Sequence, residues 1–165
     1  MSRSGAAVFL KPAEVCVAVA PTRISAVLGS CVAICLLDTG RPGTGAMCHA
    51  LLPSGTVRGV EETGRFVDGA LDLMLSRLGR LGVAPAGLRA KLFGGAELPV
   101  ADRNACQLSV GRQNIEMARR LLAAWGIPLV AENAGGTLGR KILFDTGSGE
   151  VTITFLSPSG PERAA

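Results

Sequence analysis

The sequence predicts an α+β fold, a layered sandwich of mixed β-sheets with helices on the outer faces. Short apolar runs of β type dominate both ends of the chain, only two segments show helical spacing, and several strand pairs are adjacent in sequence. These features differ from a regular βαβ array. The 165 residues fit one compact domain, 1–165, because 48% of them are hydrophobic and only 18% are charged.

Three runs in the first third are predicted strands. They cover residues 15–20, 31–37 and 46–52, and each is rich in apolar residues and closed by Pro, Gly or Asp. Because these runs are apolar with few interruptions, we expect them to form a largely buried sheet.

Two amphipathic helices are predicted to cover sheet faces. The first runs over about 66–81 and stops at Gly82, and the second begins near Gly111 and ends at Gly126 before Pro128. Their apolar stripes consist of Phe66, Val67, Ala70, Leu73, Met74, Leu78 and Leu81, and of Ile115, Ala118, Leu121, Leu122 and Trp125.

Further strands are predicted at 88–93 and 128–132. The last third then reads as a hairpin, with strands at 141–145 and 150–155 around a turn at 146–149. The glycine pairs at 94–95 and 135–136 lack the spacing of a dinucleotide or phosphate loop, so tight turns explain them better.

Composition indicates a cytoplasmic protein with reduced thiols. Its five cysteines are an odd number, the start of the chain lacks the pattern of an export signal, and no apolar stretch approaches the ~20 residues of a membrane helix. The net charge is +4, but the basic residues are scattered and aromatics are few. We therefore expect neither a nucleic-acid partner nor membrane insertion.

His49 is the only histidine, so any mechanism that requires an imidazole must use it. It lies in an apolar segment predicted to be a strand. A buried, hydrogen-bonded structural histidine is the alternative interpretation.

Cys31 follows a Gly29-Ser30 turn that leads into a predicted strand. A turn exposes a side chain together with nearby backbone N–H groups, which suits a nucleophile and its oxyanion. The alternative is an inert core cysteine. Spacing along neighbouring strands allows Cys31 and His49 to meet.

A structural zinc site is a rival interpretation of the same residues. Cys31, Cys35, Cys48 and His49 offer sulfur and nitrogen ligands, but Cys48 and His49 are adjacent on a predicted strand and should face opposite sides. The usual Cys-x-x-Cys pair is also missing from the sequence, so no metal is expected.

Five motifs, taken in order over about 12–155, resemble the CheD family of chemoreceptor glutamine deamidases. They are Leu28-Gly29-Ser30-Cys31-Val32-Ala33, Gly45-Ala46-Met47-Cys48-His49 with Leu52-Pro53, Lys91-Leu92-Phe93-Gly94-Gly95-Ala96, Gly111-Arg112-Gln113-Asn114, and Gly135-Gly136 through Gly139-Arg140-Lys141 into Phe144-Asp145-Thr146.

The resemblance implies a catalytic trio of Cys31 as nucleophile, His49 as base and Ser25 as a third, hydroxyl-bearing residue. The family usually has threonine at this third position, and serine keeps the hydroxyl but loses the methyl that restricts its rotamers. Cys48 stands where the family more commonly has asparagine. No metal or organic cofactor is implied.

The resemblance also implies a substrate and a partner. The activity would be protein-glutamine glutaminase, a hydrolase acting on the cytoplasmic helices of methyl-accepting chemotaxis receptors during adaptation, and a CheC-type phosphatase would be a binding partner. The alternative is a non-catalytic adaptor of the same fold that binds receptors or the phosphatase.

Overall fold

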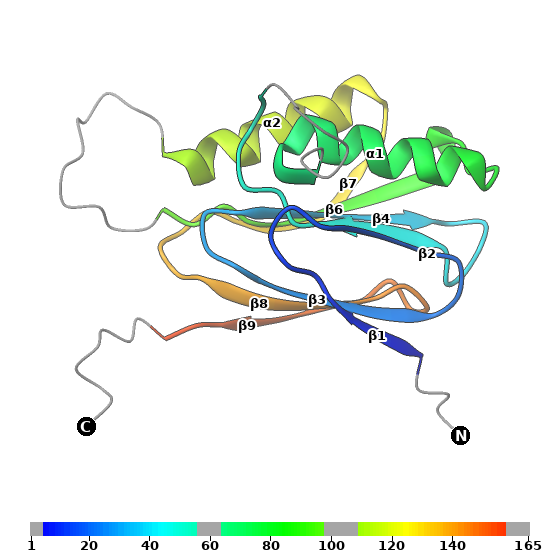
Figure 1. Ribbon diagram of the computed structural model, residues 1–165, viewed down its shortest axis with the longest axis horizontal. Coiled ribbons are helices and arrows are strands. Elements are labelled where there is room, and N and C mark those ends of the chain that lie inside the picture. Colours follow the sequence, from blue (N-terminus) through cyan, green and yellow to red (C-terminus); the bar gives the residue numbers. More distant parts are fainter. Residues whose placement is uncertain (1–4, 56–63, 98–108, 158–165) are drawn as a thin grey trace.

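The computed structural model describes residues 5–55, 64–97 and 109–157. Two β-sheets are stacked face to face, and both helices lie on the same side of the stack (Figure 1). The layers are therefore helices, a five-stranded sheet and a four-stranded sheet. This arrangement confirms the predicted α+β sandwich.

The five-stranded sheet forms the middle layer. Its order is β2 (Val15–Ala18), β5 (Gly45–Cys48), β4 (Val32–Asp38), β6 (Leu88–Gly94) and β7 (Leu129–Ala134). All neighbours are antiparallel except β6 and β7, which are parallel. β4 is central, and its first five residues are buried because both faces of the sheet are covered.

The four-stranded sheet has the order β1 (Ala6–Phe9), β3 (Thr22–Leu28), β8 (Arg140–Asp145) and β9 (Val151–Phe155). β1 runs parallel to β3, and the other pairs are antiparallel. The predicted C-terminal hairpin is confirmed as β8 and β9. Burial alternates along β3 and β8, since only one face of this sheet is packed.

The two helices are α1 (Val67–Arg80) and α2 (Val110–Ala124), with a short 3-10 turn at Pro85–Gly87 between them in sequence. Gly82 and Gly126, the predicted stop residues, both have positive φ, of 81° and 70°. Within the described ranges, neither helix is long and apolar enough to cross a membrane.

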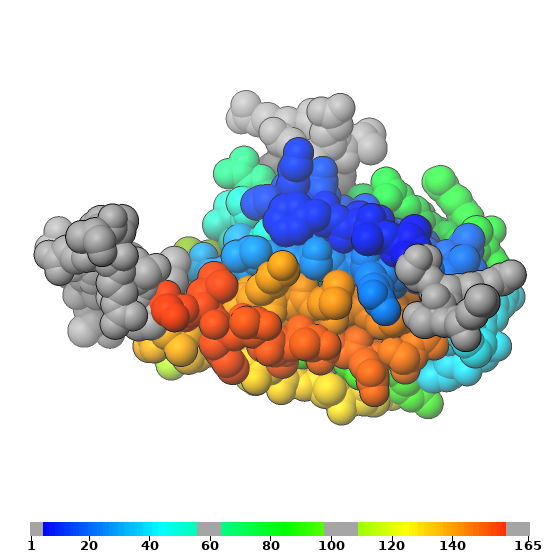
Figure 2. Space-filling model, turned by 90° about the horizontal axis from the view of Figure 1, so that it is seen from below, coloured from blue at the N-terminus to red at the C-terminus, as the bar shows by residue number. Residues whose placement is uncertain are grey.

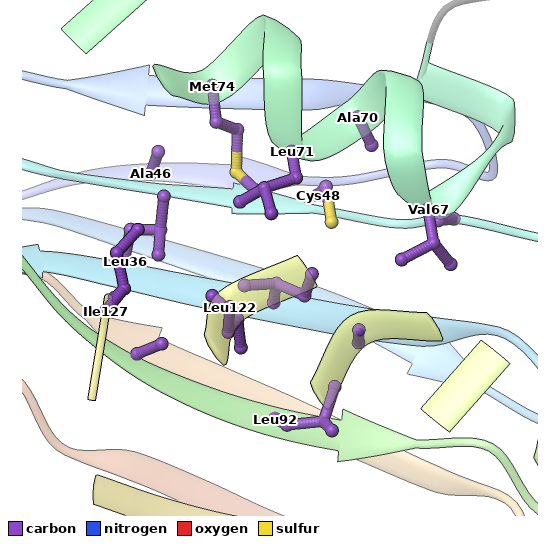
Figure 3. Packing of buried hydrophobic residues seen from close by; sticks show 14 of the residues in the cluster. Leu36, Ala46, Cys48, Val67, Ala70, Leu71, Met74, Leu92, Leu122 and Ile127 are labelled. Carbon is purple, nitrogen blue, oxygen red and sulfur yellow. The ribbon is translucent and has the colours of Figure 1, made fainter. Parts of the chain in front are cut away.

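Two apolar cores separate the layers. The first lies between the helices and the five-stranded sheet, and we call it the helix-side core. In it Leu71 and Met74 of α1 approach Cys48 of β5 (Figure 3). The second lies between the sheets, and we call it the inter-sheet core. It contains Leu10, Ile24, Ala26, Leu28, Ala33, Cys35, Met47, Phe93, Ile142 and Phe144.

The outer face of the four-stranded sheet has no helix over it among the described residues. Figure 2 views the molecule from this side, and β1, β8 and β9 form much of the visible surface. Its exposed apolar residues include Phe9, Val27 and Leu143. The prediction of helices on the outer faces therefore holds for one of the two faces.

Two strands, β1 and β3, were absent from the sequence-based prediction, and the predicted strands at 15–20 and 46–52 are too long. The segment 46–52 is regular only to Cys48, after which Ala50 forms an isolated bridge with Val32. Beyond that bridge the chain turns toward Arg65, whose carbonyl accepts from the N–H groups of Leu51 and Leu52. The ladder between β4 and β5 therefore ends beside Cys31.

Candidate active site

Cys31 lies in the turn between β3 and β4, one residue before β4 begins. Backbone hydrogen bonds hold this turn against the end of β6: the Gly95 N–H donates to the Cys31 carbonyl at 2.8 Å, and the Ala96 N–H donates to the Gly29 carbonyl at 2.9 Å. A Cβ on Gly94, where φ is 99°, would lie 2.3 Å from the Cys31 carbonyl oxygen. The backbone of the cysteine can take this position only because residue 94 is glycine.

The Cys31 side chain is half-buried and packs against the inter-sheet core. Its backbone N–H donates to no backbone carbonyl of the described residues. That N–H is therefore available to a negatively charged atom next to the thiol, as a nucleophile and oxyanion donor require.

His49 follows β5 and is 3% exposed. Its side chain points toward the inter-sheet core, because Met47, two residues earlier, faces that core. The imidazole Nδ1 lies 3.1 Å from the Leu10 carbonyl oxygen. Since a carbonyl oxygen can only accept, Nδ1 carries the proton in this hydrogen bond and Nε2 keeps its lone pair. The ring is therefore oriented with a basic nitrogen free.

The last rung of the β4–β5 ladder sets the register between the segments that carry Cys31 and His49. Val32 and Ala50 exchange two backbone hydrogen bonds, of 3.0 Å and 2.9 Å. Cys31 precedes Val32 and His49 precedes Ala50, so in this antiparallel register the two side chains are diagonal neighbours on the same face. Diagonal neighbours have Cβ atoms roughly 7–8 Å apart or less, within reach of long or aromatic side chains.

Burial favours the neutral form of both groups. It raises the pKa of the Cys31 thiol, and the cysteine's own backbone N–H partly offsets that rise. It also lowers the pKa of His49, although the Leu10 carbonyl and the Glu14 carboxylate act in the opposite direction. At neutral pH the two groups are therefore both uncharged, a thiol and an imidazole.

Ser25 lies on β3, opposite Phe9 on one side and Leu143 on the other. Its neighbours Ile24 and Ala26 face the inter-sheet core, so the Ser25 side chain points to the opposite, outer face. Among the described residues its hydroxyl makes no hydrogen bond with His49. The connection is through the main chain, because the Leu10 N–H donates to the Ser25 carbonyl at 2.8 Å.

The other described cysteines are placed differently from Cys31. Cys35 and Cys48 are fully buried, and burial raises the pKa of Cys48 to about 11. Cys48 faces the helices (Figure 3) whereas His49 faces the inter-sheet core, so their side chains are on opposite sides of the sheet as predicted. Cys16 is partly buried. Cys106 lies outside the described residues.

Two hollows flank the loop between β7 and β8. One, of about 530 Å³, is lined by Arg140, Phe155 and residues 132–138, and the other, of about 380 Å³, lies between this loop and α2. Neither is lined by Cys31 or His49. The Gly95 backbone borders the second hollow and bonds Cys31, so this hollow lies near the turn that carries the thiol.

Comparison with known proteins identifies the family. A family model described as CheD chemotactic sensory transduction matches residues 51–155. The chain belongs to the CheD family. The region matched by that model begins just after His49, but individual CheD relatives align over more of the chain.

Several CheD relatives are about 40% identical to this chain. A probable chemoreceptor glutamine deamidase CheD 2 of Geobacter sulfurreducens is 41% identical, covering 91% of this chain and 90% of the relative. A probable chemoreceptor glutamine deamidase CheD of Maridesulfovibrio salexigens is 42% identical, covering 90% of this chain and 91% of the relative. A probable chemoreceptor glutamine deamidase CheD of Thermococcus kodakarensis is 42% identical, covering 79% of this chain and 80% of the relative.

Two residues at this CheD site were not predicted from sequence, Leu10 and Asn114. Leu10 acts through its carbonyl, which every residue type carries, so no side-chain signal could have identified it. Asn114 did carry a signal, since asparagine is a poor helix former inside a predicted helix. Its side chain is fully buried and reaches the segments of both Cys31 and His49.

Proposed function

We propose that this protein hydrolyses the side-chain amide of specific glutamines in chemoreceptors, with Cys31 as nucleophile and His49 as general base. The observation that supports the proposal is the Val32–Ala50 rung, because in its register the only histidine is a diagonal neighbour of a half-buried cysteine. The names of the CheD relatives supply the substrate class.

In the first half of the reaction, Nε2 of His49 takes the thiol proton as Sγ of Cys31 attacks the carboxamide carbon of glutamine. The carbonyl oxygen becomes an oxyanion, and the free N–H of Cys31 donates to it. The tetrahedral intermediate then collapses: the C–N bond breaks, the imidazolium gives its proton to the leaving nitrogen, and ammonia departs. A thioester remains on Cys31.

In the second half, water replaces ammonia. Nε2 of His49 removes a proton from the water as its oxygen attacks the thioester carbon, and the same N–H stabilises the second oxyanion. The C–S bond breaks and the proton returns from His49 to sulfur. The product is glutamate with the free thiol restored, so the cycle requires no metal or organic cofactor.

Ser25 takes a main-chain role in this proposal. Its carbonyl accepts from the Leu10 N–H, and the Leu10 carbonyl accepts from Nδ1 of His49. This chain of two hydrogen bonds fixes the segment that orients the imidazole. Ser25 is thus a positioning residue in the trio rather than a direct partner of the ring.

Each turnover adds a negative charge to a receptor helix. Like charges on neighbouring helices repel, which changes their packing and connects the reaction with adaptation in chemotaxis. The cytoplasmic side of the receptor and a CheC-type phosphatase as a second binding partner are part of the same proposal.

Mass spectrometry of a receptor cytoplasmic fragment tests the proposal directly. Incubation with wild-type protein should convert glutamine to glutamate, a gain of about 1 Da at defined sites, and Cys31→Ala and His49→Ala should lower the rate by roughly 10⁴-fold or more. Cys35→Ala is the matched control, because that thiol is fully buried and should be dispensable.

Two results would contradict the proposal. Conversion by Cys31→Ala at the wild-type rate would remove the nucleophile from the mechanism. Receptor binding by the wild type without conversion of any glutamine would instead favour the non-catalytic adaptor.

A further inference from the structure

The β4–β5 ladder is interrupted where the two proposed catalytic residues meet. After the Val32–Ala50 rung, the antiparallel pattern would next pair Ser30 with Leu52. That rung is not formed, because the Leu52 N–H donates instead to Arg65 at 3.2 Å. The Ser30 carbonyl is therefore left without its donor from the ladder.

Asn114 of α2 occupies this gap in the ladder. Its side-chain nitrogen donates to the Ser30 carbonyl at 3.0 Å and to the Leu51 carbonyl at 2.9 Å. Ser30 immediately precedes Cys31, and Leu51 lies two residues after His49. One planar amide group therefore ties together the backbone segments that carry the nucleophile and the base.

The start of α2 is itself held in place. The Ser109 hydroxyl caps the helix by accepting from the Arg112 N–H at 3.2 Å. Gly111 packs so closely that an added Cβ would lie 2.5 Å from the carbonyl oxygens of Gly95 and Ala96. These are the residues whose N–H groups bond the Cys31 turn, so Asn114 and that turn share one rigid support.

The hydrogen bonds of the Asn114 side chain show which of its atoms favour asparagine at this position. The side chain is 0% exposed, and its Oδ1 has no hydrogen-bond partner among the described residues. The unpaired Oδ1 is unfavourable, whereas an apolar side chain of similar size would leave the Ser30 and Leu51 carbonyls without their amide donor. The two N–H donors are therefore the reason for a buried amide here.

We infer that Asn114 is a positioning residue that sets the separation of Cys31 and His49. The inference rests on the proposed function, because it assigns Asn114 a role in that Cys-His site. Asn114 donates to backbone carbonyls rather than to the thiol or the imidazole, and acts by joining the two segments where the ladder ends. Without it, the Ser30 and Leu51 segments are free to separate and the proton transfer loses its geometry.

The test compares Asn114→Leu with Leu122→Ala. Leu122 lies on the same helix, is 1% exposed and packs in the helix-side core, so its truncation lowers stability without touching the Ser30 or Leu51 segment. Asn114→Leu should lower kcat for deamidation by roughly 100-fold while KM changes by less than about threefold. Leu122→Ala should lower the melting temperature by at least as much and leave kcat within about twofold.

A second measurement is independent of receptor substrate. Site-resolved alkylation of Cys31 by iodoacetamide is followed against pH in the wild type, His49→Ala and Asn114→Leu. The Asn114→Leu profile should coincide with that of His49→Ala, since the base no longer reaches the thiol. If the wild type deamidates nothing, the proposed function fails, but this comparison still judges the positioning role.

Two results would overturn the inference: Asn114→Leu with kcat within about threefold of wild type, or an Asn114→Leu alkylation profile identical to wild type. If Asn114→Leu does not fold, Asn114→Ala replaces it, because alanine removes the same donors without inserting a larger apolar group. The expected losses and the overturning results are the same for that variant.

Discussion

The two sheets of this sandwich differ in how clearly the sequence encodes them. The five-stranded sheet is covered on both faces, and its central strand β4 is an unbroken apolar run. No helix of the described residues covers the outer face of the four-stranded sheet, and in β3 buried residues alternate with exposed or partly exposed ones. Yet both contribute to the site: the first provides Cys31 and leads into His49, and the segment after β1 of the second provides the carbonyl that orients the imidazole. The site therefore depends on how the sheets meet as well as on the residues of either one.

The largest effect should come from the end of β6 in the covered sheet. Gly94→Ala introduces a Cβ that would lie 2.3 Å from the Cys31 carbonyl oxygen, at a φ of 99°. We expect a loss of about 3 kcal/mol in the free energy of unfolding and a roughly 100-fold lower kcat.

Gly79→Ala is the control for Gly94→Ala, because a Cβ there meets nothing within 4 Å and the residue is inside α1. This variant should gain about 0.5–1 kcal/mol in urea unfolding. A Gly94→Ala protein with wild-type kcat would show that the cysteine turn tolerates displacement.

A smaller effect on kcat is expected from the four-stranded sheet. Leu10→Ala truncates a side chain that is 2% exposed and loosens the segment whose carbonyl bonds His49. Unfolding experiments should show a loss of about 2–4 kcal/mol, with kcat lower by roughly tenfold. Leu78→Ala, a fully buried truncation in the helix-side core, should match the stability loss without the loss of kcat. If Leu10→Ala and Leu78→Ala lowered kcat equally, the Leu10 carbonyl would have no specific role in orienting His49.

The pH dependence of stability tests whether His49 is neutral between the sheets. In the unfolded chain its pKa is about 6.5, and burial lowers that pKa in the folded protein. As the pH falls below the unfolded pKa, the unfolded chain takes up a proton at His49 that the folded protein does not. The free energy of unfolding therefore falls as the pH decreases from the unfolded pKa through the lower, folded pKa.

Urea unfolding at about pH 7.5 and about pH 5.5 measures the effect. Wild type should lose more stability between the two conditions than His49→Gln, whose side chain does not titrate. Parallel losses in the two proteins would mean that the folded and unfolded pKa values of His49 are the same.

The smallest effect is expected at Ser25. Its hydroxyl points to the outer face of the four-stranded sheet, and only its carbonyl bonds Leu10, so Ser25→Ala should change kcat/KM by about twofold or less. Ser25→Thr should behave in the same way. A large loss in Ser25→Ala with recovery in Ser25→Thr would instead restore a direct hydroxyl contact with the imidazole.

Sequence patterns predicted the covered parts of the fold better than the half-covered parts. Long apolar runs and the 3.6-residue period gave β4, β6 and both helices, and the glycine stops were confirmed. β1 is only four residues long and mostly exposed, and β3 contains the charged Arg23 and has only alternate residues buried. A strand with one packed face gives a weaker pattern than a strand with two.

The candidate site was likewise predicted in part. Residue chemistry made Cys31 and His49 candidates, each with a structural alternative, and only the family resemblance paired them as nucleophile and base. The backbone acceptor at Leu10 has no signature in sequence. In the sequence Asn114 was noted only as part of a motif, because its hydrogen bonds depend on where the β4–β5 ladder ends in the fold.

Cys31 and His49 flank one hairpin, so the two residues can approach each other early in folding, before the rest of the proposed site is complete. β4 and β5 are joined by a short loop, so these two residues can approach each other through a local contact with a small loop-closure entropy. The amide of Asn114 comes from a distant part of the chain and arrives with the docking of α2. Chains grow from the N-terminus, so during synthesis the thiol exists for a time beside an imidazole that lacks this second support. We therefore expect hydrolytic activity to appear late in folding, when α2 packs over a hairpin that has already formed.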